Sequence, residues 1–241
     1  MNGLALCSGI GGICAGLSQA IPGYRTVCHV EKDPYAAAVL ATRIEAGDLP
    51  SAPIYSDIRS FDGGPWRGVV DLISAGYPCQ PYSWASHRGV RSTERDPKTL
   101  WPEVLRIICE VGPRAVFLEN VPAHIQLGFS GVLGGLARAG FSAEWGVFSA
   151  AEVGAVHRRP RVFILAYADS EGKPPVPEYE EVAGIRSHAR PISWGEVATS
   201  VAVGRDDGVP NRMDRLRCLG NAVVPAQAAH AFRELYRRAC R

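Results

Sequence analysis

The first thirty residues constrain the fold more than any other stretch of the chain. Residues 4–7 are a short apolar run, residues 8–12 (Ser-Gly-Ile-Gly-Gly) form a glycine turn, residues 13–20 have a helical pattern, and residues 24–30 are a second strand. A strand, turn, helix and strand in this order are typical of α/β proteins. Proteins of this class bind their ligands at the carboxyl ends of the strands.

The glycine turn predicts the class of ligand. Glycines let the backbone come close to a ligand, and an acidic residue about twenty positions later can accept hydrogen bonds from ribose hydroxyls. Gly11 and Glu31 have this spacing. The dinucleotide pattern requires a third glycine where this chain has Cys14. The turn therefore favours a nucleoside cofactor without a pyrophosphate. An NAD-dependent oxidoreductase, which would depend on this turn alone, is the weaker alternative.

Short apolar runs alternate with amphipathic stretches along the rest of the chain. The patterns predict strands over 54–55, 69–75, 114–118, 142–148 and 162–167, and helices over 34–46, 99–110, 131–139, 212–219 and 226–238. Residues 168–211 show neither the helical nor the strand periodicity of apolar residues, so we expect a loop-rich insertion there. The expected organisation is a catalytic and cofactor-binding domain over 1–167, the short insertion over 168–211, and C-terminal helices over 212–241 that return to the first domain.

Composition excludes several classes of protein. A chain of 241 residues with 46% hydrophobic and 21% charged residues is typical of one soluble domain, with or without a small appendage. The net charge of +2 does not by itself indicate a nucleic-acid binder, so any basic surface must come from local clusters. Seven cysteines without a Cys-x-x-Cys pair argue against a disulfide framework and a structural zinc site. The sequence has no apolar run long enough to span a bilayer and no signal peptide. We therefore expect a cytoplasmic protein that does not associate with a membrane, and from the cysteine pattern one without a metal.

The stretch around Cys79 is the strongest candidate for chemistry. The apolar run 69–75 ends in Gly-Tyr-Pro-Cys-Gln-Pro, and Pro78 and Pro81 exclude a helix around the cysteine. A stiff loop at the carboxyl end of a buried strand is where α/β proteins place their sites. Alone, Cys79 is better explained as a small buried side chain, as most free cysteines are. The other strand ends favour a nucleophile.

Two further stretches place ionisable side chains at the same edge of the sheet. Glu119 follows the strand 114–118, where it is either a helix cap or an acid whose pKa is raised by its surroundings. Arg159 and Arg161 are alternate residues of a segment that we expect to be extended, so both face the site while Arg158 points away. Two guanidinium groups at one place bind phosphate or a carbonyl oxygen.

Asp57 and a basic loop complete the candidate site. Asp57 follows the third strand and lies at the same edge as Glu31, where it is either a turn former or an adenine contact. Residues 84–98 are polar and basic, with little periodicity. Their arginines are candidate phosphate contacts or an ordinary solvated loop.

In the order of the chain, these motifs resemble those of the DNA cytosine-C5 methyltransferases, and the resemblance covers nearly the whole sequence. The matching stretches are the cofactor turn at residues 8–12, the ribose and adenine contacts Glu31 and Asp57, the nucleophile motif Pro78-Cys79-Gln80, the cofactor-side pair Leu100-Trp101, the acid motif Glu119-Asn120-Val121, the arginine motif His157-x-Arg159-x-Arg161, and the last motif Gly220-Asn221. The resemblance implies a Rossmann-like S-adenosylmethionine-dependent methyltransferase fold, with a mostly parallel central sheet and a small target-recognition insertion.

The resemblance also implies the reaction. A methyl group passes from S-adenosylmethionine, leaving S-adenosylhomocysteine, to carbon 5 of a cytosine flipped out of double-stranded DNA. Cys79 adds to carbon 6 of the base, Glu119 contacts N3, and Arg159 or Arg161 lies at the O2 carbonyl and nearby phosphate. The expected cofactor contacts are Cys7, Gly9, Ile10, Gly11, Gly12, Glu31, Lys32, Asp57, Ile58, Pro78, Leu100, Asn221 and Ala222. The expected DNA contacts are Gln80, Ser83, Arg88, Arg91, His157, Arg186, Arg190 and Arg205.

Three departures from the family pattern and two alternatives accompany this interpretation. Cys7 stands where the family has a phenylalanine, and His157 stands where it has a glutamine. The insertion is short, which predicts a short recognition sequence or loose specificity. A transfer-RNA cytosine-C5 methyltransferase is the first alternative, although its Cys-Phe-Thr signature is missing. An inactive DNA-binding paralogue is the second, against which the intact Cys79 and Glu119 argue. We expect a monomer of bacterial or phage type. A companion restriction endonuclease and a stand-alone enzyme are both compatible with the sequence.

Overall fold

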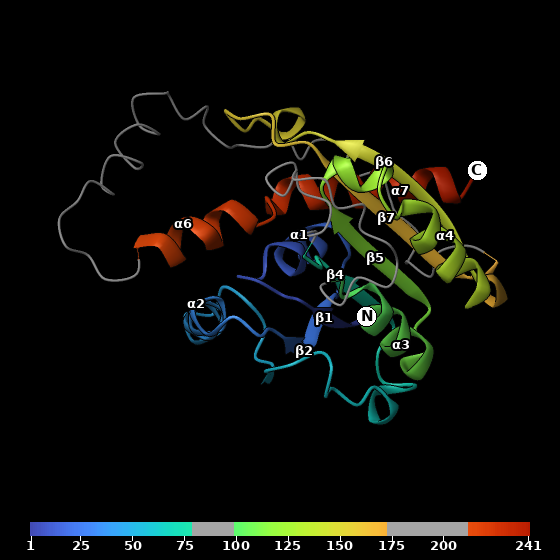
Figure 1. Ribbon diagram of the computed structural model, residues 1–241, viewed down its shortest axis with the longest axis horizontal. Helices are drawn as coiled ribbons and strands as arrows, with labels where there is room; N and C mark the ends of the chain where they lie inside the picture. The colour runs from blue at the N-terminus through green and yellow to red at the C-terminus, as the bar shows by residue number, and fades with distance from the viewer. Residues whose placement is uncertain (79–98, 173–211) are drawn as a thin grey trace.

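The computed structural model describes residues 1–78, 99–172 and 212–241. Within these ranges, one sheet contains seven strands in the order β3-β2-β1-β4-β5-β7-β6 (Figure 1). The strands are β1 (Asn2–Leu6), β2 (Arg25–Val30), β3 (Ile54–Tyr55), β4 (Leu72–Ala75), β5 (Ala115–Asn120), β6 (Phe141–Phe148) and β7 (Arg161–Ala168). The five strands from β3 to β5 are parallel, β7 runs antiparallel to β5, and β6 runs antiparallel to β7. The predicted α/β fold with a mostly parallel sheet is therefore confirmed.

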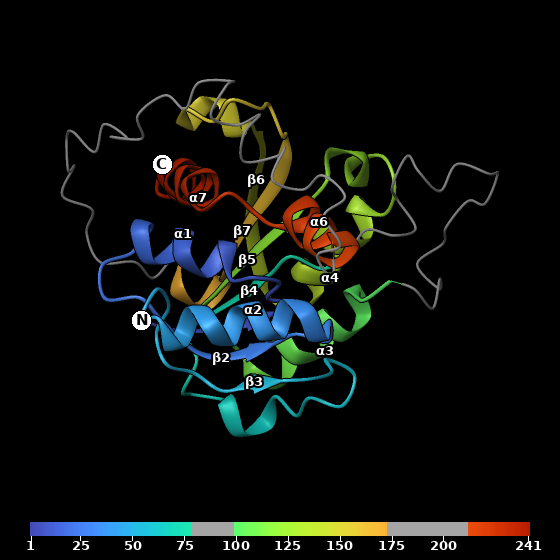
Figure 2. The ribbon, with the colours of Figure 1, turned by 90° about the vertical axis from the view of Figure 1, so that its left-hand side faces the viewer.

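Helices cover both faces of the sheet (Figures 1 and 2). Helices α3 (Trp101–Val111) and α4 (Phe129–Arg138) pack on one face, in a core that includes Leu6, Ile73 and Leu118. Helices α1 (Gly12–Ala20) and α7 (Pro225–Ala239) pack on the other, around Phe117 and Phe163. Helix α2 (Pro34–Glu45) lies on the same side as α1. Helix α6 (Arg212–Asn221) precedes α7, and short 3-10 turns cover 64–66, 122–125, 150–153 and 169–171.

The α1–α7 contact depends on two glycines. A Cβ atom added to Gly12 would lie 2.2 Å from the carbonyl oxygen of Val223, and one added to Gly16 would lie 2.6 Å from that of Pro225. Both positions therefore exclude a side chain. The close approach brings the chain before α7 against the glycine turn that precedes α1.

Several predicted strand boundaries are wrong, and Glu119 lies within β5 instead of after the strand 114–118. The run 69–75 was expected to be one strand, but β4 begins at Leu72, because the N–H groups of Val69 and Val70 bond to the carbonyl of Trp66 in a turn. Val69 is accordingly 46% exposed. The first strand was expected to include Cys7, but β1 ends at Leu6, because Cys7 has a φ of 51°.

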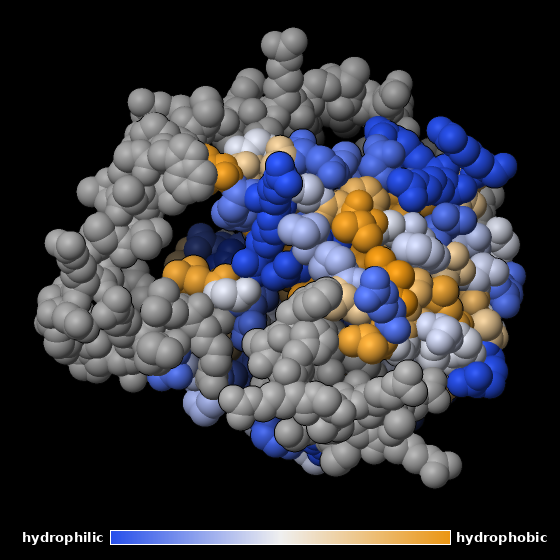
Figure 3. Space-filling model, turned by 45° about the horizontal axis from the view of Figure 1, so that its top comes forward, coloured by the Kyte–Doolittle hydropathy of each residue, from blue (hydrophilic) through white to orange (hydrophobic). Residues whose placement is uncertain are grey.

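The described surface carries both hydrophilic and apolar residues (Figure 3). The large apolar side chains that the structure exposes include Trp145 and Val147 of β6. Isolated apolar side chains on a surface are ordinary. Among the helices in the described ranges, none is long and apolar enough to cross a bilayer.

Candidate active site

A cavity of about 690 Å³ opens at the carboxyl ends of the parallel strands, where the sequence predicted the site. Its size lies in the range of small-molecule and cofactor sites. The predicted cofactor residues that line it are Cys7, Gly9, Ile10, Gly12, Glu31, Lys32, Ile58, Pro78, Leu100, Asn221 and Ala222, and the predicted catalytic residues are Glu119 and Arg161. The structure thus brings residues from the whole chain to one place. Gly11 and Asp57 are not among the lining residues.

The glycine turn and Glu31 form one side of the cavity. Gly9 and Gly11 have φ angles of 54° and 82°, which favour glycine. The N–H of Gly9 donates to Glu31 Oε2 at 2.7 Å, and the N–H of Asp33 donates to Glu31 Oε1 at 2.8 Å. The carboxylate is therefore fixed in orientation against the turn, at the predicted ribose position. Gly11 faces away, since a Cβ there would meet Leu49 at 2.6 Å.

Asp57 makes contacts that fit the turn-former interpretation. Its Oδ1 accepts from the N–H of Arg59 at 3.0 Å, and Oδ2 accepts from Lys32 Nζ at 2.8 Å. The hydrogen bond from Lys32 is the main cause that lowers the pKa of Asp57. Asp57 lies at the same edge as Glu31, as predicted, because Lys32 follows Glu31 directly.

Cys7 contributes a neutral sulfur to the cavity wall. Burial is the main cause that raises the pKa of its thiol to about 12, and the charge of Glu31 adds to the effect. The side chain therefore acts as a small, polarisable apolar group at neutral pH.

Glu119 is the buried acid of the site. It lies near the end of β5, is 8% exposed, and pairs through Oε1 with Arg161 Nε at 2.9 Å. Burial raises the pKa of its carboxyl to about 7, against the opposing effects of Arg161 and Arg159. The expectation of a raised pKa is confirmed. The capping alternative is wrong, because the N-cap of the following turn is Val121.

The two arginines of the predicted motif differ in their contacts. Arg159 has a φ of 39°, so the segment is not extended there, and the alternation argument that placed both side chains in the site is wrong. Its Nη2 donates to the carbonyls of Gly220 and Ala222, at the end of α6. Arg161 reaches Glu119 and the cavity instead. Arg158 is exposed, as expected, and so is His157.

A buried network that sequence reasoning missed fixes the chain just before Cys79. Asn120 Nδ2 donates to the carbonyl of Tyr77 at 3.2 Å, and its Oδ1 accepts from the N–H of Val121 at 2.9 Å. His124 Nδ1 lies 2.9 Å from the carbonyl of Leu127, which can only accept, so Nδ1 carries the proton. Nε2 then accepts from the Tyr77 hydroxyl at 2.9 Å. Asn120, directly after Glu119, was the sequence feature that could have indicated this network.

Several predicted site residues lie outside the described ranges. These are the nucleophile candidate Cys79 and the DNA-contact candidates Gln80, Ser83, Arg88, Arg91, Arg186, Arg190 and Arg205. Pro78, the last described residue before them, lines the cavity.

Comparison with known proteins bears on the family. The sequence model of the C-5 cytosine-specific DNA methylase family matches residues 1–192. The type II methyltransferase M.NgoMIV of Neisseria gonorrhoeae is 34% identical over 167 residues, which are 68% of this chain and 50% of that protein. M.CviJI of Paramecium bursaria Chlorella virus IL3A is 29% identical over 226 residues, 92% of this chain and 57% of that protein. The chain thus spans about half the length of these relatives.

Solved structures share the fold. A DNMT2 of Spodoptera frugiperda has a TM-score of 0.57 at 19% identity, covering 75% of this chain and 53% of its own. The Dnmt2 of S. pombe has a TM-score of 0.56 at 21% identity, with coverages of 70% and 50%. The resemblance seen in the motifs is confirmed by the family match, which extends over most of the chain. The protein is a member of the C-5 cytosine-specific DNA methylase family.

Proposed function

We propose that this protein transfers a methyl group from S-adenosylmethionine to carbon 5 of cytosine in double-stranded DNA. Membership of the family implies S-adenosylmethionine as the cofactor. The observation that carries the proposal is the buried Glu119–Arg161 pair, 2.9 Å apart, in the wall of a cofactor-sized cavity beside Pro78. This pair supplies an acid and a cation where a cytosine bound by Cys79 would need both.

The residues of the cavity fit an adenosyl cofactor. Glu31 presents a fixed carboxylate for ribose hydroxyls, and the glycine turn exposes backbone close to the cavity. Ile58 and Leu100 supply apolar walls for a base, and Cys7 adds its sulfur. When bound, S-adenosylmethionine supplies an electrophilic methyl group. The chain's contribution is to bind it and to hold the target base beside it.

The chemistry of the base assigns the remaining roles. Carbon 5 of cytosine is a poor nucleophile until the Cys79 thiolate adds to carbon 6 and electrons move toward N3. Protonated Glu119 donates a hydrogen bond to N3 as charge develops there, and Arg161 stabilises charge at the O2 carbonyl. With a pKa near 7, Glu119 is partly protonated at neutral pH. Loss of the carbon-5 proton then expels Cys79. The base must leave the duplex, at a cost of roughly a few kcal/mol.

Arg159 has a supporting role in this proposal. Its guanidinium binds the carbonyls of Gly220 and Ala222, so it holds the end of α6 near the cavity. Arg161 is therefore the one assigned to the base.

A substrate analogue tests the covalent step. Duplex DNA with 5-fluorocytosine cannot lose a proton from carbon 5, so the enzyme should remain attached through Cys79. In the presence of S-adenosylmethionine we expect an adduct that survives denaturant for the parent protein and none for Cys79→Ser. An equal adduct in the variant would contradict Cys79 as nucleophile. Adduct formation only with fluorocytosine-containing transfer RNA would favour the RNA alternative.

We further propose that residues 168–211 read a short recognition sequence, that the protein acts as a monomer, and that a restriction endonuclease accompanies it. The short insertion supports the first of these statements, and the type II names of the relatives support the last. Sequencing of methylated cytosines in mixed DNA gives the recognition sequence. A strict site of about six base pairs would contradict the role of so short an insertion.

A further inference from the structure

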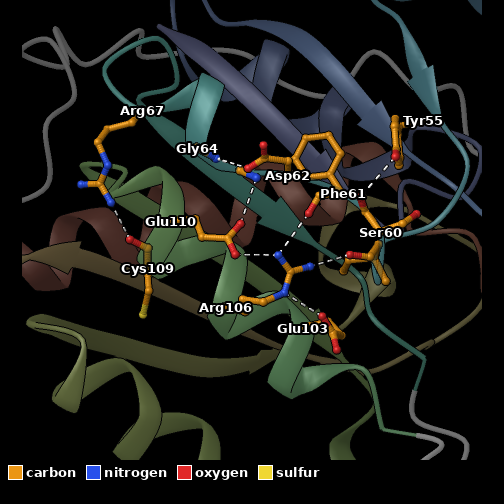
Figure 4. A network of polar contacts seen from close by, with 12 residues as sticks. Tyr55, Ser60, Phe61, Asp62, Gly64, Arg67, Glu103, Arg106, Cys109 and Glu110 are labelled. Atoms are coloured by element: carbon orange, nitrogen blue, oxygen red, sulfur yellow. Dashed lines mark hydrogen bonds and ion pairs between the residues drawn. The ribbon is translucent and has the colours of Figure 1, made fainter.

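Arg106 of α3 lies at the centre of a network of polar contacts between this helix and the loop that follows β3 (Figure 4). Its Nη2 donates to the carbonyl of Ile58 at 2.8 Å, and its Nη1 donates to the carbonyl of Phe61 at 3.1 Å. Neither carbonyl belongs to a strand or helix. Buried carbonyls outside regular structure need such partners. The side chains of Ile58 and Phe61 are both buried in the core, so the guanidinium binds the backbone of a loop that is anchored at both residues.

Two acids on α3 fix Arg106 in turn. Glu103 Oε2 accepts from Nε at 2.8 Å, and Glu110 Oε1 accepts from Nη1 at 2.7 Å. The other oxygen of Glu110 accepts from the N–H of Gly63 at 2.9 Å, which holds the end of the same loop. A Cβ on Gly63 would lie 2.8 Å from that oxygen. The four side-chain contacts of Arg106 use its forked geometry, which an ammonium group does not have.

Both parts that Arg106 joins line the cavity, whereas Arg106 itself does not. Ile58 and Arg59 form the wall on the loop side, and Leu100, the N-cap residue of α3, forms wall on the helix side. The bonds of Arg106 thus join the helix that begins after Leu100 to the loop that carries Ile58 and Arg59. Glu119 and Arg161 come from β5 and β7, outside this connection.

We propose that Arg106 is a positioning residue for the cofactor: it holds the Ile58–Arg59 wall at the distance from Leu100 that the adenosyl group requires. The inference rests on the proposed use of S-adenosylmethionine. The wall would contact the adenosyl group, which S-adenosylmethionine shares with S-adenosylhomocysteine. Loss of Arg106 therefore weakens the binding of both ligands. The reacting groups are unaffected, so the KM for the cofactor rises while kcat at saturating cofactor remains near the parent value.

Calorimetric titration with S-adenosylhomocysteine, beside steady-state kinetics, tests this role in three variants. Arg106→Met removes all the contacts. Arg106→Lys keeps a charge beside Glu103 and Glu110 but cannot bridge two carbonyls. The matched control is Arg237→Met, which removes an arginine that pairs with Glu234 on α7, away from the cavity. We expect about a tenfold weaker Kd for Arg106→Met, equivalent to about 1.4 kcal/mol. The Kd of Arg106→Lys should lie between those of the parent and Arg106→Met, and the control should bind S-adenosylhomocysteine as the parent does.

The outcomes separate this inference from the proposed function. Parent-like cofactor affinity in both Arg106 variants overturns the inference alone, as does a loss confined to kcat. If Arg106→Met fails to fold, the comparison of Arg106→Lys with the control decides, with the melting temperature measured without ligand. A parent protein that binds neither S-adenosylmethionine nor S-adenosylhomocysteine contradicts the proposed function, and the inference with it. Tight binding without methyl transfer contradicts the proposed reaction only.

Discussion

The buried carboxyl of Glu119 makes the stability of the protein depend on pH. Its pKa is about 7 in the folded chain, against an ordinary value of 4.5. A raised pKa means that folding favours the protonated form. The stabilising contribution is therefore complete below pH 4.5 and is lost as the pH rises through 7. The difference between the two pKa values corresponds to about 3 kcal/mol.

Glu119→Gln isolates this contribution, because glutamine resembles the protonated acid in shape and carries no charge. The free energy of unfolding is measured by urea denaturation of parent and variant at intervals from pH 4.5 to 8. We expect the difference, variant minus parent, to increase by about 3 kcal/mol across this range, with most of the change below pH 7. Carbon-13 NMR of the labelled carboxyl gives the pKa directly. A difference that stays constant with pH, or a carboxyl that titrates near 4.5, would refute the reasoning.

Two further predictions concern the walls of the site. Gly12→Ala should lower the free energy of unfolding by about 1–3 kcal/mol, because the new methyl group meets the backbone of Val223. The control Gly134→Ala, whose methyl group makes only an ordinary contact within α4, should be neutral or slightly stabilising. Equal losses of stability in urea titrations of the two variants would contradict the close approach. Arg161→Met removes the main charge that opposes the effect of burial on Glu119, so the pKa of that carboxyl should rise further above its ordinary value. Carbon-13 NMR of the carboxyl measures this pKa. An unchanged titration would show that the ion pair does not influence the pKa of Glu119.

The sequence predicted the parts of the site that depend on strand ends. A parallel sheet collects the carboxyl ends of its strands at one edge, so the order of apolar runs was enough to place Glu31, Asp57 and Glu119 at that edge, where Glu31 and Glu119 line the cavity. Burial of Glu119 follows from its place near the end of an apolar strand in the middle of the sheet, and this burial raises its pKa.

The contacts that sequence reasoning missed depend on tertiary geometry. Arg159 turns at a φ of 39°, which no local pattern in its segment indicates, and its partners are about sixty residues away in the chain. The spacing of Glu103, Arg106 and Glu110 predicts ion pairs along one helix. It does not indicate that the same guanidinium binds the loop at Ile58 and Phe61. That contact exists only because α3 packs beside the loop.

The most direct test of the account is methyl transfer from S-adenosylmethionine to mixed-sequence duplex DNA, compared with transfer RNA, for the parent and for Cys79→Ser. Bisulfite sequencing of the DNA product locates the methylated carbon and its sequence context. The account predicts methylation at carbon 5 of cytosine in DNA, which disappears in the variant. Methylation of transfer RNA alone, or DNA methylation that persists in Cys79→Ser, would contradict it.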